Sequence, residues 1–304
     1  MNNKMLVETC IYCKSKSKIY LNSSNNSDEK KINFTSTEIL IKENEIKPNL
    51  FYCTNCEIIF SEFCKNKFED NYRDVIDSQY ISQIENKKLY FKNLINKISK
   101  YIKDTDDVLE IGSYYGAFGS EIKKKVKSYK GIELSKFASN YANKEFGLNI
   151  SNENIFNYLD ESKKKFDIIF MFDVIEHLDD PKEVIKVCSK NLNKNGRLII
   201  STMNMDSFFA KLTGKHYPWI ISQHKFYFTD KSIKKLLNSS NLELNKITND
   251  VRIISLEYLF LKISQKIKYL KFFYKIILKL KFLKNTKIKF SLFDINIYCA
   301  VLKN

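Results

Sequence analysis

A cluster of glycines is the feature that most constrains how this chain can fold. The 304 residues contain only seven glycines, and one short stretch, VLEIGSYYGAFGSEI, holds three of them: Gly112, Gly116 and Gly119. The apolar residues 107–111 before the turn are typical of a buried strand. From residue 117 apolar residues recur at four-residue steps, as on an amphipathic helix. The sequence therefore predicts a strand, a glycine turn and a helix whose first N–H groups can bind a ligand.

The spacing of this turn narrows the class of ligand. A P-loop would end in Gly-Lys followed by Ser or Thr, and that triplet is missing here. A dinucleotide fingerprint spaces its glycines two and then three residues apart. Here the spacing is four and then three, and Tyr114 stands where the middle glycine would be. These differences favour a nucleoside ligand without a pyrophosphate. The alternative is a tight strand–helix turn of any α/β protein.

Two later segments also read as strands that end near an acidic residue. Residues 128–134 (SYKGIEL) carry Glu133, placed about twenty residues past the turn, where a carboxylate can accept hydrogen bonds from ribose hydroxyls. Residues 166–172 are almost continuously apolar, as in a central parallel strand, and Asp173 follows them. Because open α/β sheets bind ligands at the carboxyl ends of their strands, these groups are expected to face one site.

A helix and a further strand come next. Pro181 stands where proline is tolerated, in the first turn of a helix. Asn195-Gly196 is predicted to end this helix, and RLIIST forms the following strand. VLEIGSYYG, GIELS, FDIIFMFDVIEHLDDP and LNKNGRLIIST together resemble the successive motifs of class I S-adenosylmethionine-dependent methyltransferases, over roughly residues 85–250 and the last strand. The most similar variety has Glu-His after the fourth strand, as in ubiquinone-type O-methyltransferases and many bacterial sugar and small-molecule methyltransferases.

The resemblance implies an α/β fold with a Rossmann-like, mostly parallel seven-stranded sheet, and S-adenosylmethionine as cofactor. The implied cofactor-binding residues are Glu110, Gly112, Ser113, Tyr114, Gly116, Glu133, Leu134, Asn154, Ile155 and Asp173. Of these, Glu133 is implied to bind the ribose hydroxyls, Asn154 and Ile155 to flank the adenine, and Asp173 to lie near the amino-acid end. The family usually has a glycine at the position of Tyr114. Either the backbone approaches the cofactor differently here, or the tyrosine ring lines the site.

Cysteine spacing predicts a second module. Four of the seven cysteines form two pairs, Cys10-x-x-Cys13 and Cys53-x-x-Cys56. Two such pairs in a cytosolic chain predict a tetrahedral zinc site, because each pair can hold the metal from one turn. The alternative is two redox pairs or free thiols. The remaining cysteines are expected to be ordinary thiols: Cys64, Cys188 and Cys299. Many bacterial sugar methyltransferases are similar in beginning with a structural four-cysteine module, so residues 1–64 are predicted to be a zinc-binding module.

The remaining chain divides into a linker and the main domain. Residues 65–103 are predicted to be a helical linker or lid, with Tyr90, Leu94 and Ile98 on one face. Residues 104–304 are the predicted methyltransferase domain, with a basic helical insertion at about 256–290. Residues 258–292 hold ten lysines and no acidic residue. Such a basic amphipathic helix can lie on a membrane surface, or pack on the core or on a second subunit. The last strand, INIYCAVLK, is antiparallel in the family's topology.

Histidines mark the expected acceptor side of the site. His177, His216 and His224 fall within 48 residues, together with the only tryptophan, Trp219. Residues 203–228 follow the strand RLIIST and are expected to form a loop over the carboxyl ends of the strands. Methyl transfer needs alignment and removal of the acceptor's proton, because the sulfonium is already activated. His224 or His177 is predicted to be the catalytic base. The alternative for each is a structural role.

Composition bounds the partners. A net charge of +16 suggests nucleic acid, but lysine is frequent throughout and only three arginines occur. The first ten residues lack a signal peptide's apolar run, and no apolar run reaches the about 18 residues of a membrane span. We therefore expect a cytoplasmic enzyme that can also lie at the inner face of the membrane. The predicted acceptor is a small molecule, first a sugar or nucleotide-sugar of a surface-polysaccharide pathway. The alternatives are an RNA methyltransferase, a ubiquinone-type O-methyltransferase at the membrane surface, and a non-catalytic cofactor-binding protein.

Overall fold

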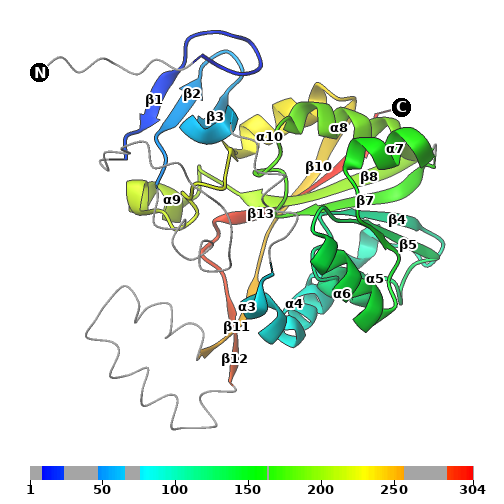
Figure 1. Ribbon diagram of the computed structural model, residues 1–304. Helices are drawn as coiled ribbons and strands as arrows, with labels where there is room; N and C mark the ends of the chain where they lie inside the picture. The colour runs from blue at the N-terminus through cyan, green and yellow to red at the C-terminus, as the bar shows by residue number, and fades with distance from the viewer. Residues whose placement is uncertain (1–8, 24–46, 66–75, 163, 257–285, 304) are drawn as a thin grey trace, which may run out of the picture.

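A seven-stranded sheet lies at the centre of the computed structural model, which describes residues 9–23, 47–65, 76–162, 164–256 and 286–303 (Figure 1). The strands, in the order β10-β13-β8-β7-β4-β5-β6, are β4 (Asp107–Ile111), β5 (Ser128–Ile132), β6 (Ile150–Ser151), β7 (Phe166–Phe172), β8 (Leu192–Met203), β10 (Leu242–Asn249) and β13 (Ile295–Leu302). Strand β13 is antiparallel to both β8 and β10, whereas the other adjacent pairs are parallel. The predicted fold class and the antiparallel last strand are confirmed.

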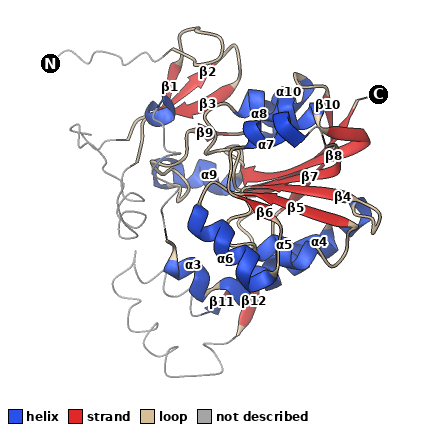
Figure 2. Ribbon diagram, turned by 45° about the vertical axis from the view of Figure 1, so that its right-hand side comes forward, coloured by secondary structure: helices blue, strands red, loops and turns tan. Residues whose placement is uncertain are grey.

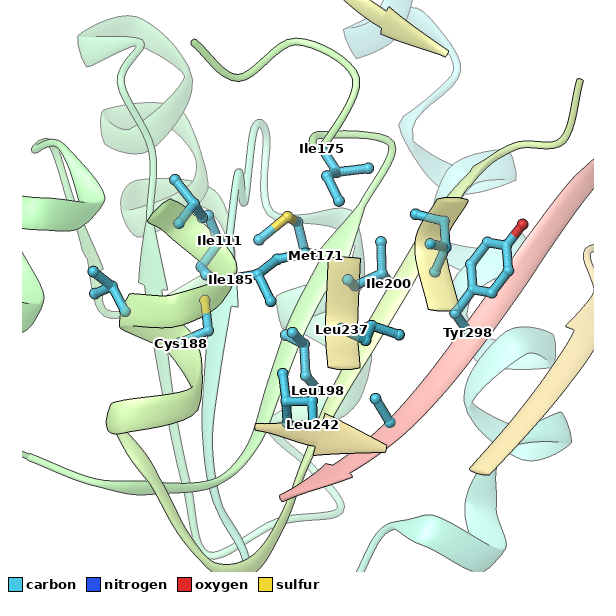
Figure 3. Close-up of a cluster of buried hydrophobic side chains, with 14 of the residues drawn as sticks. Ile111, Met171, Ile175, Ile185, Cys188, Leu198, Ile200, Leu237, Leu242 and Tyr298 are labelled. Carbon is cyan, nitrogen blue, oxygen red and sulfur yellow. The ribbon is translucent and has the colours of Figure 1, made fainter. Parts of the chain in front are cut away.

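Helices cover both faces of this sheet, and alternate residues of β7 supply the two halves of the core (Figure 2). Ile168 and Phe170 share a cluster with residues of α4 (Ile84–Lys97) and α5 (Ala117–Ile122). Ile169 and Met171 share another with residues of α8 (Pro181–Lys190) and α10 (Asp230–Asn238) (Figure 3). The remaining helices of the main domain beside the sheet are α6 (Lys136–Phe146) and α7 (Ile155–Ser162). Burial on both faces explains why β7 is apolar except at Asp167. The Asp167 carboxylate accepts hydrogen bonds from the Asp107 N–H and the Asn193 side chain, both at 2.8 Å.

The helix after β7 begins as predicted and ends earlier. Pro181 occupies its first turn, and the Asp180 carboxylate accepts a hydrogen bond from the Glu183 N–H at 3.0 Å as an N-cap. The helix stops at Lys190, so the prediction that Asn195-Gly196 ends it is wrong. Those two residues lie inside β8 instead, because pairing with β7 already begins at Leu192.

The segment predicted as one helix over 65–103 is divided. Its described part consists of α3 (Ser78–Ser82), α4 and the short 3₁₀ turn η2 (Ser99–Tyr101), and Gln83 interrupts the first two. A second 3₁₀ turn, η1 (Glu62–Lys65), precedes the segment, and residues 66–75 lie outside the described part. The predicted face is confirmed, since Leu94, Ile98 and Tyr90 belong to one core cluster.

The N-terminal strands join the main domain through a second sheet. Strands β1 (Lys18–Leu21), β2 (Leu50–Cys53) and β3 (Ile58–Ser61) form an antiparallel ladder, and β3 also pairs with β9 (Phe226–Tyr227). Residues from both parts share one hydrophobic cluster, which includes Phe60 and Phe226. The four-cysteine region therefore packs directly against the histidine-bearing segment of the chain.

The chain before β13 contains a small hairpin. Strand β11 (Arg252–Ser255) pairs antiparallel with β12 (Lys287–Phe290). The predicted basic helical insertion at about 256–290 lies mostly outside the described residues, which omit 257–285. Its last residues, 287–290, form strand β12, so the prediction of a helix is wrong there, because they pair with β11. No helix within the described ranges is long and apolar enough to span a bilayer.

Candidate functional site

The glycine turn lies between β4 and α5, at the carboxyl edge of the sheet. Gly112 has a φ of +74° and Gly116 a φ of +76°, in the left-handed region that favours glycine. A Cβ added to Gly112 would lie 2.4 Å from Val174 Cγ2, and one at Gly116 would lie 2.6 Å from Leu148 Cδ1. The backbone conformation and the close neighbours both require glycine here.

Tyr114 has a φ of +46°, in the left-handed region that favours glycine. Its hydroxyl donates to the Asp77 carboxylate at 3.0 Å, and Asp77 is the N-cap of α3. Its ring also packs edge-on against Tyr80 and Tyr115, with centroids 4.7 and 4.5 Å away. The Asp77 N–H in turn donates to the Tyr115 hydroxyl at 2.8 Å. The two tyrosines thus fasten α3 to the glycine turn.

Two buried carboxylates flank this turn. Glu133 follows β5, and its oxygens accept hydrogen bonds from the Tyr114 N–H at 2.7 Å and the Ser135 N–H at 2.8 Å. Glu110, in β4, accepts from the Tyr129 hydroxyl at 2.5 Å. Burial raises the pKa of Glu133, and it raises the pKa of Glu110 to about 8. Glu133 therefore holds the turn from the neighbouring strand, while Glu110 is directed toward Tyr129.

Ser113 lies in the glycine turn itself, where its hydroxyl donates to the Glu110 carbonyl at 3.3 Å. Three other predicted cofactor residues lie in or next to the two loops that follow β5 and β6. Leu134 is half-buried, and its carbonyl accepts from the Asn152 side chain at 2.7 Å. The Asn154 side chain accepts from the Phe156 N–H at 2.8 Å, just before α7. Ile155 is buried in the main hydrophobic cluster. These loops place Leu134 and Asn154 on the same side of the sheet as Glu133.

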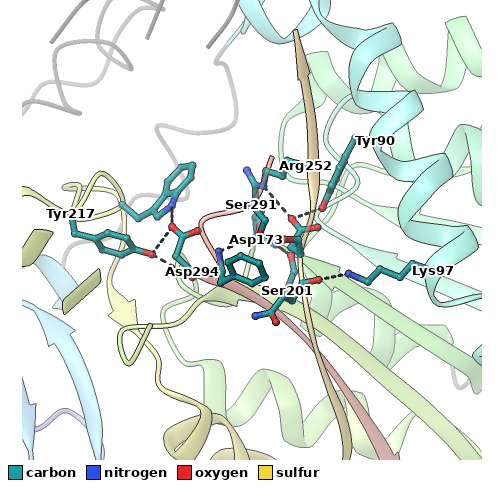
Figure 4. A network of polar contacts seen from close by, with 12 residues as sticks. Tyr90, Lys97, Asp173, Ser201, Tyr217, Arg252, Ser291 and Asp294 are labelled. Atoms are coloured by element: carbon teal, nitrogen blue, oxygen red, sulfur yellow. Dashed lines mark hydrogen bonds and ion pairs between the residues drawn. The ribbon is translucent and has the colours of Figure 1, made fainter. Parts of the chain in front are cut away.

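Asp173 follows β7 with a left-handed φ of +53°. Its carboxylate accepts from the Ser201 hydroxyl and from Arg252 Nη2, both at 2.8 Å (Figure 4). Arg252 Nε also donates to Asp250 at 3.1 Å, and the guanidinium lies 5.5 Å from the Trp219 ring centroid. Sequence reasoning missed Arg252, because it belongs to no motif and reaches Asp173 only through the β11–β12 hairpin.

A small pocket opens beside Arg252. Its volume is about 110 Å³, and it is lined by Phe209, Pro218, Trp219, Asp250, Arg252, Ser291, Leu292, Asp294 and Ile295. Asp294 forms its inner wall, where it accepts from the Trp219 indole N–H at 3.0 Å and the Tyr217 hydroxyl at 3.1 Å. Aromatic rings and carboxylates therefore meet next to the arginine that holds Asp173.

Two of the three histidines meet, as the structure folds residues 203–228 back onto the turn after β7. The rings of His177 and His224 have centroids 4.7 Å apart at 71°. His224 Nδ1 lies 2.8 Å from the Trp219 carbonyl, and His177 Nδ1 lies 3.1 Å from the Gln223 carbonyl. Because a carbonyl can only accept, each Nδ1 carries the proton and each Nε2 has a lone pair. His216, in the 3₁₀ turn η3 (Gly214–His216) after α9 (Phe208–Thr213), is exposed and outside this pair.

Glu176 completes this group, and sequence reasoning did not assign it a role. It is buried, and it accepts from the Thr202 hydroxyl at 3.0 Å. Ligand atoms of Glu176, His177 and His224 all lie within 4.8 Å of one another, so the three could hold a metal ion. Burial raises the pKa of Glu176 to about 8 and lowers the pKa of His224 well below its ordinary value. The Glu-His pair in the sequence was the signal, but only its histidine was considered.

The four paired cysteines also converge. Their sulfur atoms, from Cys10, Cys13, Cys53 and Cys56, lie within 4.8 Å of one another. Both pairs form the same turn, since the N–H four residues after the first cysteine donates back to its carbonyl. The residues that close these turns, Lys14 and Glu57, have φ of +58° and +59°. Zinc with four ligands at about 2.3 Å needs sulfurs about 3.8 Å apart. This arrangement fits a tetrahedral zinc ion; Cys64, Cys188 and Cys299 lie elsewhere.

Comparison with known proteins finds a methyltransferase domain in this chain. The family model described as a methyltransferase domain matches residues 82–247. The ubiquinone biosynthesis O-methyltransferase of Pelagibacter ubique is 28% identical over 127 residues, which cover 40% of this chain and 51% of that protein. The mitochondrial ubiquinone biosynthesis O-methyltransferase of Saccharomyces cerevisiae is 28% identical over 159 residues, 49% of this chain and 46% of its own. This chain thus spans about half the length of these relatives.

A solved structure supports the fold. A chain in the complex of the Haloferax volcanii Trm112 methyltransferase activator with a methyltransferase superposes with a TM-score of 0.52 at 10% identity, over 80% of this chain and 98% of its own length. At this identity the likeness concerns the fold alone.

Proposed function

Because the chain belongs to the class I S-adenosylmethionine-dependent methyltransferase family, we propose that it transfers the methyl group of S-adenosylmethionine to a small-molecule acceptor. One observation carries this proposal beyond the family match. The buried Glu133 carboxylate is hydrogen-bonded to the Tyr114 N–H of the glycine turn, so the ribose-binding acid and the turn form a single unit. Such a unit suits a nucleoside that carries no pyrophosphate.

The chain's own residues divide the cofactor among them. Glu133 would accept hydrogen bonds from the ribose hydroxyls. Leu134, Asn154 and Ile155 would lie beside the adenine, and Asp173, fixed by Arg252 and Ser201, beside the amino-acid end. The bound cofactor supplies a methyl group on a sulfonium that is already activated. The protein then has to orient the acceptor in line and take up its proton.

His224 and His177 are the proposed bases. Hydrogen bonds from each Nδ1 to a backbone carbonyl leave a lone pair on Nε2. Burial keeps the pKa of His224 below its ordinary value, so its imidazole is neutral at physiological pH and can accept a proton. The Glu176 carboxyl group lies within 4.8 Å of both imidazoles, and in its ionised form it would stabilise the imidazolium that forms.

The same three groups support a second mechanism. A carboxylate oxygen and two imidazole nitrogens are a donor set that transition-metal ions bind. With a cation held there, Glu176, His177 and His224 would act as its ligands, and the acceptor hydroxyl would lose its proton more easily. Dialysis against a weak chelator that leaves the cysteine-bound zinc in place, as checked by elemental analysis, followed by addition of Mn²⁺ or Mg²⁺, separates the two mechanisms. A base mechanism predicts unchanged turnover after this treatment, whereas a metal-assisted mechanism predicts loss and recovery.

The acceptor is proposed to be a hydroxyl-bearing small molecule. The relatives named as ubiquinone biosynthesis O-methyltransferases favour a phenolic acceptor that carries a lipid tail, the alternative in the sequence prediction, over the sugar that came first there. Contact with the inner face of the membrane, and homodimerisation through residues 258–292, stay predictions, because residues 257–285 lie outside the described chain.

A panel assay with radiolabelled S-adenosylmethionine tests this function. The acceptors are a prenylated catechol in detergent, a nucleotide-sugar mixture and total RNA. We expect label in the catechol, and label only in RNA or in sugars would replace the proposed acceptor. Label in none, with cofactor binding intact, would favour a protein that uses the site for binding alone. The zinc ion is also proposed, as a structural one, and elemental analysis should find one per chain.

A further inference from the structure

The segment that carries His224 is held between two parts of the molecule. On the side of the turn after β7, the N–H groups of Lys225 and Phe226 both donate to the Glu176 carbonyl, at 2.8 and 3.1 Å. On the side of the four-cysteine region, the Lys225 carbonyl accepts from the N–H of Ser61, the last residue of β3, at 2.9 Å. His224 is the residue directly before Lys225, so the placement of its ring depends on both sets of contacts.

The contact with Ser61 comes from the four-cysteine region. Strand β9 has only two residues, and its partner is β3, through the pairs Ile59–Tyr227 and Phe60–Phe226. Strand β3 begins two residues after Cys56. A strand this short cannot hold its own conformation in water. The position of β9 therefore depends on β3, and the second cysteine pair fixes the position of β3.

The first cysteine pair contacts the same segment by another route. Tyr12, between Cys10 and Cys13, stacks on the Phe226 ring at 5.8 Å with an interplanar angle of 18°. Cys10, Cys53 and Phe226 are all buried in one cluster. Exposed pairs between Glu57 and Lys231 or Lys235 add contacts to α10, but such pairs contribute little. The buried stacking and the β3–β9 ladder are the stronger connection.

We propose that the four-cysteine module positions the catalytic histidines, with Tyr12 as the positioning residue. Metal binding at the four sulfurs would fix both cysteine turns; Tyr12 and β3 would then hold β9, and with it His224 against Glu176 and His177. This inference rests on the proposed function for its catalytic consequence. Its structural part, that the module controls the conformation of residues 224–227, does not depend on any acceptor.

The test compares Tyr12→Ala with Tyr12→Phe, which keeps the ring. Hydrogen exchange at the Lys225 and Phe226 amides is followed by NMR. We expect the alanine variant to exchange these amides about tenfold faster, while Leu109 in β4 is unchanged. Tyr12→Phe should behave as the parent protein.

Cys53→Ser disturbs the four-cysteine module independently of Tyr12, and Cys299→Ser is its matched control. Both cysteines are buried, but Cys299 lies on β13 in a separate cluster. We expect Cys53→Ser and the chelated parent protein to lose the protection of the Lys225 and Phe226 amides, and Cys299→Ser to keep it. Unchanged exchange at residues 225–226 in Tyr12→Ala, Cys53→Ser and the chelated protein would overturn the inference. Failure of the methyltransferase assay alone would leave these readouts intact and would count against the proposed function only.

Discussion

The two halves of the site are built from contacts of different range. The donor half consists of the glycine turn with Glu110 and Glu133, and its key hydrogen bonds join residues 19 apart in sequence. The acceptor half consists of Asp173, Arg252 and the Glu176–His177–His224 group. Its longest-range contacts join residues 46 and 79 apart, in the pairs His177–Gln223 and Asp173–Arg252. The donor half is thus fixed by one supersecondary unit, whereas the acceptor half depends on how distant segments pack. Mutations can therefore affect the halves separately.

The largest difference between the effect on turnover and the effect on cofactor affinity is expected at His224. Because a general base typically contributes 10²–10⁴-fold, His224→Ala should lower turnover by about that factor and leave the affinity for S-adenosylmethionine within about twofold. Single-turnover kinetics with a saturating cofactor measure the first quantity and calorimetry the second. His216→Ala is the matched control, since His216 is exposed and outside the group. A variant with full turnover would remove His224 from the chemistry and leave His177 as the base to test.

Glu133→Ala should have the opposite profile. Hydrogen bonds to a charged group contribute about 1.5–3 kcal/mol each, so cofactor affinity should fall about 10- to 100-fold. Calorimetric titration with S-adenosylhomocysteine measures this, with the exposed Glu183→Ala as the control. Glu133→Gln keeps one acceptor oxygen and should lose less. Equal affinities in the parent protein, Glu133→Ala and Glu133→Gln would mean that the end of β5 does not bind the ribose.

A smaller effect is expected from pH, acting on the donor half through Glu110. Its pKa is raised to about 8 by burial, so the folded protein retains a proton that the unfolded chain releases. The free energy of unfolding should therefore fall as pH rises from about 4.5 to about 8, by up to about 1.4 kcal/mol per pH unit for this group. Glu176 acts in the same direction. Urea titrations at pH 7 and 8 should give a shallower fall for Glu110→Gln. An unchanged slope would mean that Glu110 is ionised in the folded state.

The smallest effect concerns Tyr114, which joins the donor half to α3. Tyr114→Phe removes the hydroxyl that donates to Asp77, a loss of about 1 kcal/mol. The melting temperature should drop by about 2–4 °C, with faster amide exchange in α3. Tyr20→Phe, on the surface, should not change either quantity. If the two variants behave alike, the tyrosine does not fasten α3 to the turn.

The sequence predicted the strand, glycine turn and helix of the donor half, with Glu133 beside them, for a physical reason. Strand, turn and acidic residue follow one another in the chain, so the carboxyl edge of the sheet brings Gly112 and Glu133 together without information from elsewhere. The mostly parallel seven-stranded sheet and the antiparallel β13 came with the same motifs through the family resemblance. The interruption at Gln83 was not visible, because apolar spacing continues across it.

The acceptor half was only partly predictable. The sequence marked His177 and His224 as candidates, and their contact came from the fold. Arg252 lies in a short hairpin strand and has no motif, so only tertiary packing reveals its ion pair with Asp173. Pairing of β9 with β3 was equally hidden, since a two-residue strand leaves no periodic signal. Residues whose role depends on distant partners could not be assigned from local pattern.

A crystal structure of the protein with S-adenosylhomocysteine tests the central claim most directly. The account predicts the ribose hydroxyls in hydrogen-bond contact with Glu133. It also predicts the imidazole of His224 or His177 within about 8 Å of the sulfur, close enough to serve an acceptor between them, given the about 3 Å reach of a proton-accepting hydrogen bond. A ligand bound away from the glycine turn, or both imidazoles turned into the core with the ligand in place, would contradict the account.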